Sequence, residues 1–134
     1  MRNHKIPITK VQDAFNAAIK RRDCRCMIKD FELCCGVLEC SHFFTVGGSP
    51  SLRFYPLNAY AQCSRHHQNH HAGGTLYSDF MMDFHQADLD KMLSMKNRII
   101  KYTDDLKRQI IKLCNEDKLD ELKMLIEGEI NDRY

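Results

Sequence analysis

The sequence predicts an α+β fold: a ββα unit that carries metal-binding residues, between an N-terminal helix and a C-terminal helical region. Three observations lead to it. Six of the seven cysteines fall between Cys24 and Cys63. One cysteine and four histidines crowd into CSRHHQNHH, at positions 63–71. From about Gln86 onward, apolar residues recur at three- and four-residue spacing, which is typical of amphipathic helices. A chain of 134 residues suits one domain-sized core.

Residues 9–22, TKVQDAFNAAIKRR, predict the first helix. Thr9 is a plausible N-cap, since its hydroxyl can accept a backbone N–H of the first turn. An apolar stripe follows at helical spacing, formed by Val11, Phe15, Ala18 and Ile19. The helix ends in a basic run that suits a helix C-terminus, Lys20, Arg21 and Arg22.

The central segment predicts a knuckle-like loop followed by the ββα unit. Residues 23–40 hold five cysteines, with Gly36 directly after Cys34 and Cys35. LECSHFFT at 38–45 reads as a strand, and VGGSPS at 46–51 has turn composition. LRFYP at 52–56 is a second strand or an extended return, and 57–71 is expected to be helical from about Asn58.

The C-terminal region predicts a long amphipathic helix from about Gln86 to Leu113, a break near residues 115–117, and a second helix from Leu119. Together they form a helical hairpin, or one long helix that packs on a partner. Such a stripe is most often core or oligomer interface, so a homodimer through these helices is one hypothesis.

Composition restricts the class of protein. The first ten residues, MRNHKIPITK, are polar, and no apolar run approaches the roughly 18 residues that a membrane span requires. We therefore expect a cytoplasmic protein without membrane contact, where clustered Cys and His indicate metal rather than disulfides.

Charge is distributed unevenly along the chain. Residues 1–74 carry 10 Lys/Arg against 5 Asp/Glu, and residues 75–134 carry 10 Lys/Arg against 13 Asp/Glu. The basic half suits a phosphate-bearing partner, or is simply solvated surface charge.

Cys63 and His66 are spaced C-x-x-H, the spacing of half a tetrahedral zinc site. The other half must come from earlier cysteines. Cys35 is the first choice because Gly36 lets the backbone turn toward the metal, and Cys26 is the second. Cys24 and Cys34 remain alternatives. We predict a structural Zn²⁺ on Cys26, Cys35, Cys63 and His66, against the competing interpretation of buried free thiols.

A second site is predicted beside the first. His67 and His71 are four residues apart and share one helix face, as His66 and His70 do. The two pairs point about 100° apart, so one ion cannot readily take all four imidazoles. With His66 on zinc, His67 and His71 can hold another metal with an open coordination position, as catalysis needs. His42 on the preceding strand can then take a proton from water.

Asn58, expected at the start of the helix, can orient a neighbouring loop or imidazole by hydrogen bonding. The order His42, Asn58, His67, carried by ECSHFF and then SPSLRFYPLNAYAQCSRHHQ and AGG, resembles the HNH endonucleases. Within that family the pattern is similar to the NinG/Rap-type recombination proteins of phage lambda, over roughly residues 20–84. One departure is Ser41, where many members carry a metal-binding Asp or His.

The resemblance implies a ββα-metal (HNH or His-Me finger) core with a structural zinc knuckle. It assigns His42 as the general base, Asn58 as the central asparagine and His67 as the last residue of the signature. Cys63 and His66 match the second half of the zinc site, and His71 matches an extra metal-binding histidine of some members.

The expected function is that of a metal-dependent DNA endonuclease in phage recombination, acting on branched or nicked DNA in the host cytoplasm. Residues 1–84 would form the nuclease domain and 85–134 a helical region for packing or dimerisation. Mg²⁺ or Mn²⁺ on His67 and His71 is the expected catalytic metal. Phosphate contacts are expected from Arg53, Arg65, Arg22 and Arg25. Two alternatives are a zinc-stabilised nucleic-acid-binding module without catalysis and a helical protein-interaction domain with a zinc knuckle.

Overall fold

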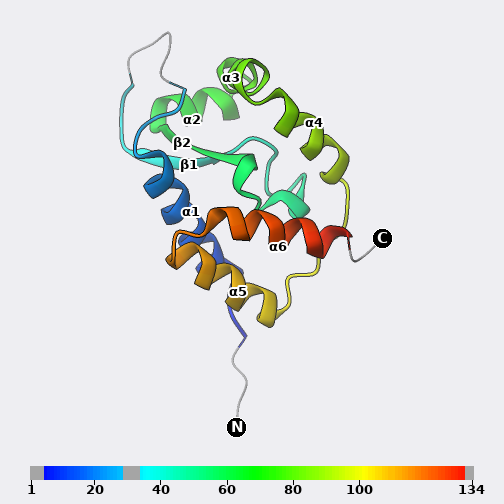
Figure 1. The fold of residues 1–134 in the computed structure, drawn as a ribbon. Coiled ribbons are helices and arrows are strands. Elements are labelled where there is room, and N and C mark those ends of the chain that lie inside the picture. The colour runs from blue at the N-terminus through cyan, green and yellow to red at the C-terminus, as the bar shows by residue number, and fades with distance from the viewer. Residues whose placement is uncertain (1–4, 29–33, 132–134) are drawn as a thin grey trace.

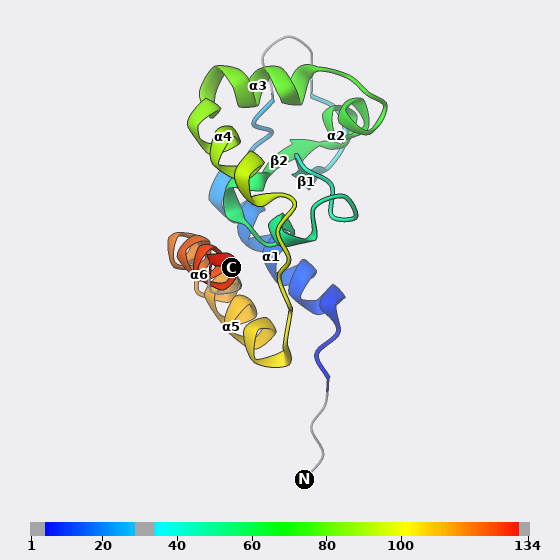
Figure 2. The same ribbon diagram turned by 90° about the vertical axis from the view of Figure 1, so that its right-hand side faces the viewer.

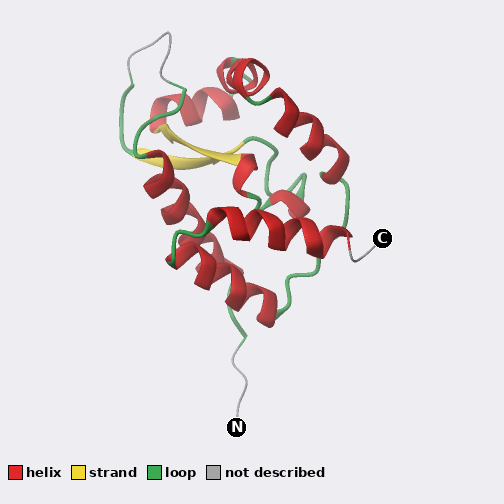
Figure 3. Ribbon diagram, viewed as in Figure 1, coloured by secondary structure: helices red, strands yellow, loops and turns green. Residues whose placement is uncertain are grey.

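The computed structural model describes residues 5–28 and 34–131, and it confirms the α+β class (Figures 1 and 3). These residues form six α-helices and a two-stranded antiparallel sheet, with two short 3-10 helices labelled η. The order is α1 (Ile8–Asp23), β1 (Leu38–His42), η1 (Pro50–Leu52), η2 (Pro56–Asn58), β2 (Ala59–Cys63), α2 (Ser64–His71), α3 (Leu76–Phe84), α4 (Gln86–Met95), α5 (Asp104–Asn115) and α6 (Leu119–Asn131).

The first helix is confirmed, but it begins at Ile8 with Pro7 at the N-cap, so the predicted capping by Thr9 is wrong. α1 buries the predicted stripe completely, with Val11, Phe15, Ala18 and Ile19 all at 0% exposure. It ends where Cys24 adopts a left-handed conformation, with φ of 63°, and donates its N–H to the Lys20 carbonyl at 2.8 Å. The chain then turns back toward the sheet.

The two strands form a hairpin whose register runs from Leu38 opposite Cys63 to His42 opposite Ala59. α1 and α2 each pack against both strands, and Figure 1 shows them on opposite sides of the sheet. The sheet is therefore covered on both faces. A ββα order is present, as the sequence predicts.

The second strand lies later in the chain than expected. The prediction of helix throughout 57–71 is wrong for Ala59–Cys63, which form β2, and helix begins only at Ser64. All five residues of β2 are buried. A strand covered on both faces shows no alternation of apolar and polar residues, so the period-two signal is missing. Residues 52–56 form no strand, and 3-10 turns flank them instead.

The C-terminal prediction is partly wrong. Instead of one helix from 86 to 113, α4 ends at Met95 and α5 begins at Asp104. Thr103 caps the new helix, because its Oγ1 accepts the Leu106 N–H at 3.1 Å. The break near 115–117 is confirmed, since α5 ends at Asn115 and Asp117 has a φ of 55°. α3 was not expected.

The helical hairpin α5–α6 packs on α1, at the opposite end of the molecule from α3 (Figure 2). One hydrophobic cluster runs from α1 through β2 to α6 and crosses the expected boundary between residues 84 and 85. The stripe from which a homodimer was expected is covered by this chain itself, with Leu106, Ile110, Leu122, Ile126 and Ile130 at 0–1% exposure. Within 5–28 and 34–131 we find no helix with the length and apolar character of a membrane span.

Candidate metal centre and histidine cavity

Three cysteines and one histidine from four segments meet at the edge of the sheet: Cys26, Cys34, Cys63 and His66. Cys26 follows α1, Cys34 precedes β1, Cys63 ends β2 and His66 lies in the first turn of α2. Their ligand atoms all lie within 4.8 Å of one another. Cys26, Cys63 and His66 are buried, and Cys34 is exposed.

This geometry fits a tetrahedral ion. His66 Nδ1 lies 3.2 Å from Cys26 Sγ, 3.4 Å from Cys63 Sγ and 4.0 Å from Cys34 Sγ. In a tetrahedron with Zn–S near 2.3 Å and Zn–N near 2.0 Å, neighbouring ligand atoms lie about 3.5–3.8 Å apart. The group can therefore hold a structural zinc ion through three sulfurs and Nδ1.

The pKa shifts of the Cys34 and Cys63 thiols are consistent with a cation bound between the sulfurs. Loss of solvation, and then Cys26 and Cys63, raise the pKa of the Cys34 thiol to about 11. Burial opposes ionisation of Cys63 as well, but the backbone N–H groups of His66 and Cys35 and the neighbouring thiols outweigh it and lower the Cys63 pKa. Three thiolates cannot ionise side by side without a positive charge, and a bound zinc supplies one.

Cys34, and not the predicted Cys35, completes the group. The carbonyl of Cys35 accepts the Arg65 N–H at 3.2 Å, and the Val37 carbonyl accepts the Ser64 N–H at 2.9 Å. These bonds tie the knuckle to the start of α2. Gly36 is required there, because it has a φ of 90° and a Cβ would lie 2.8 Å from Ser64 Cβ. The bend at Gly36 is present as predicted. The residue whose sulfur joins the ligand group is Cys34, two positions before Gly36, and not Cys35.

A cavity of about 370 Å³ opens beside this centre. The three histidines predicted for catalysis line it together, although they come from β1 and α2. The lining residues are Gln12, Asn16, Cys40, His42, Thr45, Val46, Arg53, His67 and His71.

His42 is held in one tautomer. Its Nε2 lies 2.8 Å from the Arg53 carbonyl oxygen, and a carbonyl can only accept, so Nε2 carries the proton and Nδ1 keeps its lone pair. The ring packs against Phe15, with centroids 5.6 Å apart. Burial lowers the pKa of His42 more than the hydrogen bond to the Arg53 carbonyl raises it, and the charge of Arg53 adds to the lowering. The imidazole is therefore neutral at pH 7 and able to accept a proton.

Asn58 holds the segment that follows His42. Its Oδ1 accepts the Phe44 N–H at 2.9 Å, and its Nδ2 donates to the Phe44 and Leu52 carbonyls at 3.0 and 3.2 Å. The side chain is fully buried. It closes the segment between β1 and Arg53 into a rigid loop, as the sequence predicts for an orienting asparagine, although it lies in η2 and not at the start of a helix.

His67 and His71 turn their Nε2 atoms toward each other at 2.9 Å. Behind them, Glu39 Oε1 lies 2.9 Å from His67 Nδ1. The carboxylate can only accept, so Nδ1 carries a proton and the Nε2 lone pair faces His71. Two ligands at ~2.1 Å and 90° on an octahedral ion lie about 3 Å apart, so the pair can serve one metal. A carboxylate behind a ligating imidazole is the usual support for such a ligand.

His70 bonds to a different partner. Its Nε2 donates to the Phe43 carbonyl at 3.2 Å, and its ring stacks on Phe43. His70 therefore supports the turn after β1 and is not available as a partner for His66, which faces the thiols.

The four predicted phosphate-binding arginines lie in different places. Arg53 lines the histidine cavity. Arg65 is exposed on α2, and Arg25 is exposed after α1. Arg22 stabilises the fold instead, because it binds Asp23 at 2.7 Å, donates to the Pro56 and Ala59 carbonyls and stacks on Tyr60.

Ser41, the residue before His42, is fully buried, and its Oγ has no hydrogen-bond partner among the described residues.

The sequence did not predict a role for two polar residues that line the cavity, Gln12 and Asn16, or for Glu39, which contacts His67. Gln12 and Asn16 lie in the first predicted helix, where the sequence indicates only packing. The available signal was the i, i+4 spacing of Gln12 and Asn16 on the helix face beside the buried stripe. Nothing local marks Glu39, whose partner lies 28 residues later.

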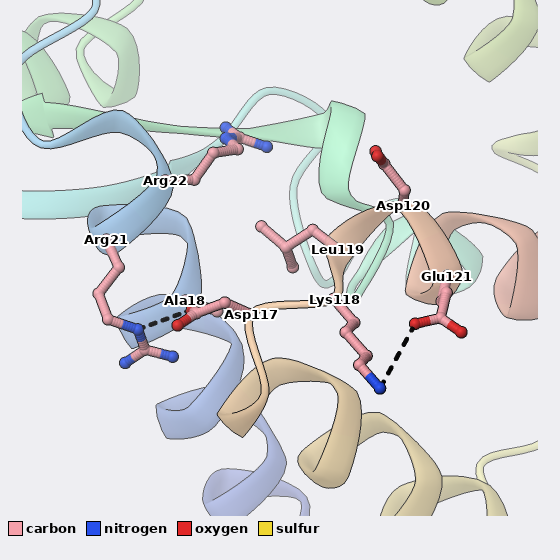
Figure 4. Close-up of a pocket in the computed structure, with 8 residues that line it drawn as sticks. All are labelled: Ala18, Arg21, Arg22, Asp117, Lys118, Leu119, Asp120 and Glu121. Atoms are coloured by element: carbon pink, nitrogen blue, oxygen red, sulfur yellow. Dashed lines mark hydrogen bonds and ion pairs between the residues drawn. The ribbon is translucent and has the colours of Figure 1, made fainter.

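A larger cavity, of about 740 Å³, lies between α1 and the start of α6 (Figure 4). It is crossed by the ion pair of Arg21 Nε and Asp117 Oδ1 at 2.8 Å, and Leu119 points into it. Its walls balance three cationic against three acidic side chains, Arg21, Arg22 and Lys118 against Asp117, Asp120 and Glu121. This balance favours no charged ligand, and the candidate chemistry lies in the histidine cavity.

Comparison with known proteins gives no further identification, since no family model, curated protein or solved structure matches the chain significantly. The resemblance to HNH endonucleases rests on the sequence motif alone.

Proposed function

We propose that this chain is a metal-dependent DNA endonuclease of the HNH type. The observation that carries the proposal is the shared cavity of His42, His67 and His71, in which a neutral imidazole with a free Nδ1 lies beside an imidazole pair suited to one metal. A base and a Lewis acid at one phosphate are the groups that phosphodiester hydrolysis needs.

His67 and His71 would hold the catalytic metal, with Glu39 fixing the orientation of His67. When bound, a divalent ion there would supply Lewis-acid polarisation of the phosphoryl oxygens and stabilise the leaving oxygen. Mg²⁺ and Mn²⁺ are the proposed ions. Imidazole nitrogens prefer first-row transition ions to Mg²⁺, so Mn²⁺ is the first to test.

His42 would take the proton of the attacking water on Nδ1. The Arg53 carbonyl keeps Nε2 protonated, and Asn58 bonds to both sides of the intervening loop, so Nδ1 keeps its lone pair in a ring that lines the cavity. Because burial lowers the pKa of His42, the base is unprotonated at neutral pH. The residue thus needs no activating partner beyond the backbone.

DNA is the proposed partner. Arg53 brings a positive charge into the cavity, and the N-terminal half of the chain carries the basic excess. Action on branched or nicked DNA in phage recombination is an extension from the motif resemblance. A homodimer would give two sites for paired cuts on a symmetric junction, and a monomer in sedimentation at high protein concentration would exclude it.

A second candidate function is a zinc-stabilised nucleic-acid-binding module without catalysis. Ser41 favours it, because the residue before the base is a buried hydroxyl instead of a metal ligand. Tyr77 also donates to the Ser41 carbonyl at 2.8 Å, which fixes this position in the core. The module would keep the Cys₃His centre and the basic half of the chain, and the histidine cavity would catalyse no reaction.

One assay separates the two functions. Zinc-loaded protein is incubated with a labelled four-way junction, a nicked duplex and a linear duplex, in Mn²⁺ and then in Mg²⁺, and both binding and cleavage are measured. Cleavage supports the nuclease, and the preferred substrate tests the recombination analogy. Tight binding without cleavage in either metal refutes the nuclease and supports the binding module.

A further inference from the structure

Two amides and an arginine line the histidine cavity together with the histidine pair. Gln12 and Asn16 lie one turn apart on α1, and Arg53 follows η1. Gln12 Nε2 donates to Asn16 Oδ1 at 2.8 Å, and Arg53 Nε donates to Gln12 Oε1 at 2.8 Å. The three side chains are partly exposed and form a continuous hydrogen-bonded chain along the cavity.

The direction of this chain is fixed by chemistry. A guanidinium has donors and no acceptor, so the atom of Gln12 that meets Arg53 Nε must be oxygen. The other end of the Gln12 amide is then the NH₂ group, which donates, so the atom of Asn16 that meets it must also be oxygen. Asn16 is left with its Nδ2 group, which carries two donors. Among the described residues this group has no hydrogen-bond acceptor.

These side chains therefore offer donors. Arg53 contributes its terminal nitrogens and Asn16 contributes Nδ2, while the oxygens of both amides already accept one hydrogen bond each. Of the described residues that line the cavity, none is acidic. A surface of this kind binds a ligand group that only accepts hydrogen bonds and carries negative charge, as the non-bridging oxygens of a phosphodiester do.

We propose that Asn16 and Arg53, aligned by Gln12, form a second phosphate subsite that holds the nucleic-acid backbone next to the phosphate at the histidines. This inference rests on the proposed function. The cavity volume of about 370 Å³ lies within the ~300–1,000 Å³ typical of small-ligand sites, so it has room for a nucleotide segment and not only for one phosphate. α1 then contributes to substrate positioning as well as to the core.

The same polarity argues against base reading. An asparagine recognises adenine through a bidentate contact that needs its oxygen to accept from N6 and its nitrogen to donate to N7. Asn16 Oδ1 already accepts from Gln12 Nε2, so a bidentate contact with adenine would have to share that oxygen, while Nδ2 has both donors available. The subsite should therefore be independent of sequence.

Two variants test the subsite by DNA binding. Asn16→Asp replaces the donor by a carboxylate oxygen. Gln12→Glu keeps the acceptor for Arg53 but cannot donate to Asn16, so Asn16 must turn its amide and present oxygen to the cavity. Asn115→Asp makes the same charge change at the exposed end of α5 and is the matched control. Binding is measured by fluorescence anisotropy with a short A·T duplex and a short G·C duplex, at low salt without catalytic metal.

We expect Asn16→Asp and Gln12→Glu each to weaken binding by about tenfold relative to Asn115→Asp, equally on both duplexes, since hydrogen bonds to charged groups are the strong ones. Equal affinity of Asn16→Asp and Asn115→Asp would overturn the subsite while leaving the nuclease proposal intact. A loss confined to the A·T duplex would replace phosphate contact by base reading. Wild-type protein that binds neither duplex would refute the proposed function, and the subsite with it.

Discussion

Replacement of Asn58 by alanine tests the loop that carries the base. The change removes three hydrogen bonds, to the Phe44 N–H, the Phe44 carbonyl and the Leu52 carbonyl, at 2.9, 3.0 and 3.2 Å. Asn58 is fully buried, so water cannot replace these bonds unless the segment opens. At about 1 kcal/mol for each bond, and more where a partner stays buried and unpaired, we expect a loss of about 3–4 kcal/mol in the free energy of unfolding.

Urea denaturation of the zinc-loaded protein measures this loss, with Asn115→Ala as the control because Asn115 is exposed at the end of α5. The control should change stability by less than about 0.5 kcal/mol. A loss below about 1 kcal/mol in Asn58→Ala, the size of a single bond, would refute the three-bond account.

Asn58→Asp tests the direction in which the loss of stability changes with pH. Its carboxylate still accepts the Phe44 N–H, but the second oxygen can donate only when it is protonated, and then to one of the two carbonyls. Burial raises the pKa of such a carboxyl, so the folded state binds its proton more tightly than the unfolded state does. Relative to wild type, the variant should be less destabilised near pH 5 than near pH 8. The opposite order would contradict the donor role of Nδ2.

Three further predictions concern the metals and the base. Cys34→Ser should abolish tight zinc binding while Cys35→Ser keeps it, measured by zinc content after dialysis, because only the Cys34 sulfur joins the ligand group. Glu39→Gln should weaken Mn²⁺ binding by about 10–100-fold in calorimetry, because it removes the carboxylate behind His67. The pH profile of cleavage should fall on the acid side with a midpoint below about 6.5, because burial lowers the pKa of His42 and the protonated imidazole cannot act as a base.

Each of these has a contrary outcome. Zinc retained by Cys34→Ser and lost by Cys35→Ser would restore the original ligand prediction. Unchanged Mn²⁺ affinity in Glu39→Gln would remove Glu39 from the metal site, and Glu116→Gln, at an exposed position just after α5 that does not line the cavity, controls for net charge. An acid midpoint above 6.5 would mean that the titrating group is not a buried, neutral His42.

The sequence was informative where the signal is local. The apolar stripe of α1 follows from helical spacing, and the half-site of Cys63 and His66 follows from C-x-x-H. The pairing of His67 with His71 follows from the i, i+4 geometry of one helix, and the structure brings their Nε2 atoms to 2.9 Å. Each of these relations joins residues within one element, so spacing alone predicts it.

The relations that failed or were missed join distant segments. Cys34 and Cys35 are neighbours, and the choice between them depends on the contact of Gly36 with Ser64, 28 positions away. β2 was read as helix because it is buried on both faces, which depends on α1 and α2 packing against it. Arg53 reaches Gln12 across 41 residues, so the hydrogen-bonded chain that lines the cavity has no local signature.

The rate of plasmid cleavage by wild type and by His42→Ala tests the central claim most directly. Supercoiled DNA is incubated with zinc-loaded protein in Mn²⁺, beside His85→Ala, which removes a histidine outside the cavity near Tyr60. We predict that His42→Ala lowers the rate by about 10²–10⁴-fold, the range for loss of a general base, while zinc content stays full and His85→Ala keeps the wild-type rate. Equal rates for wild type and His42→Ala, or no cleavage by zinc-loaded wild type, would contradict the account.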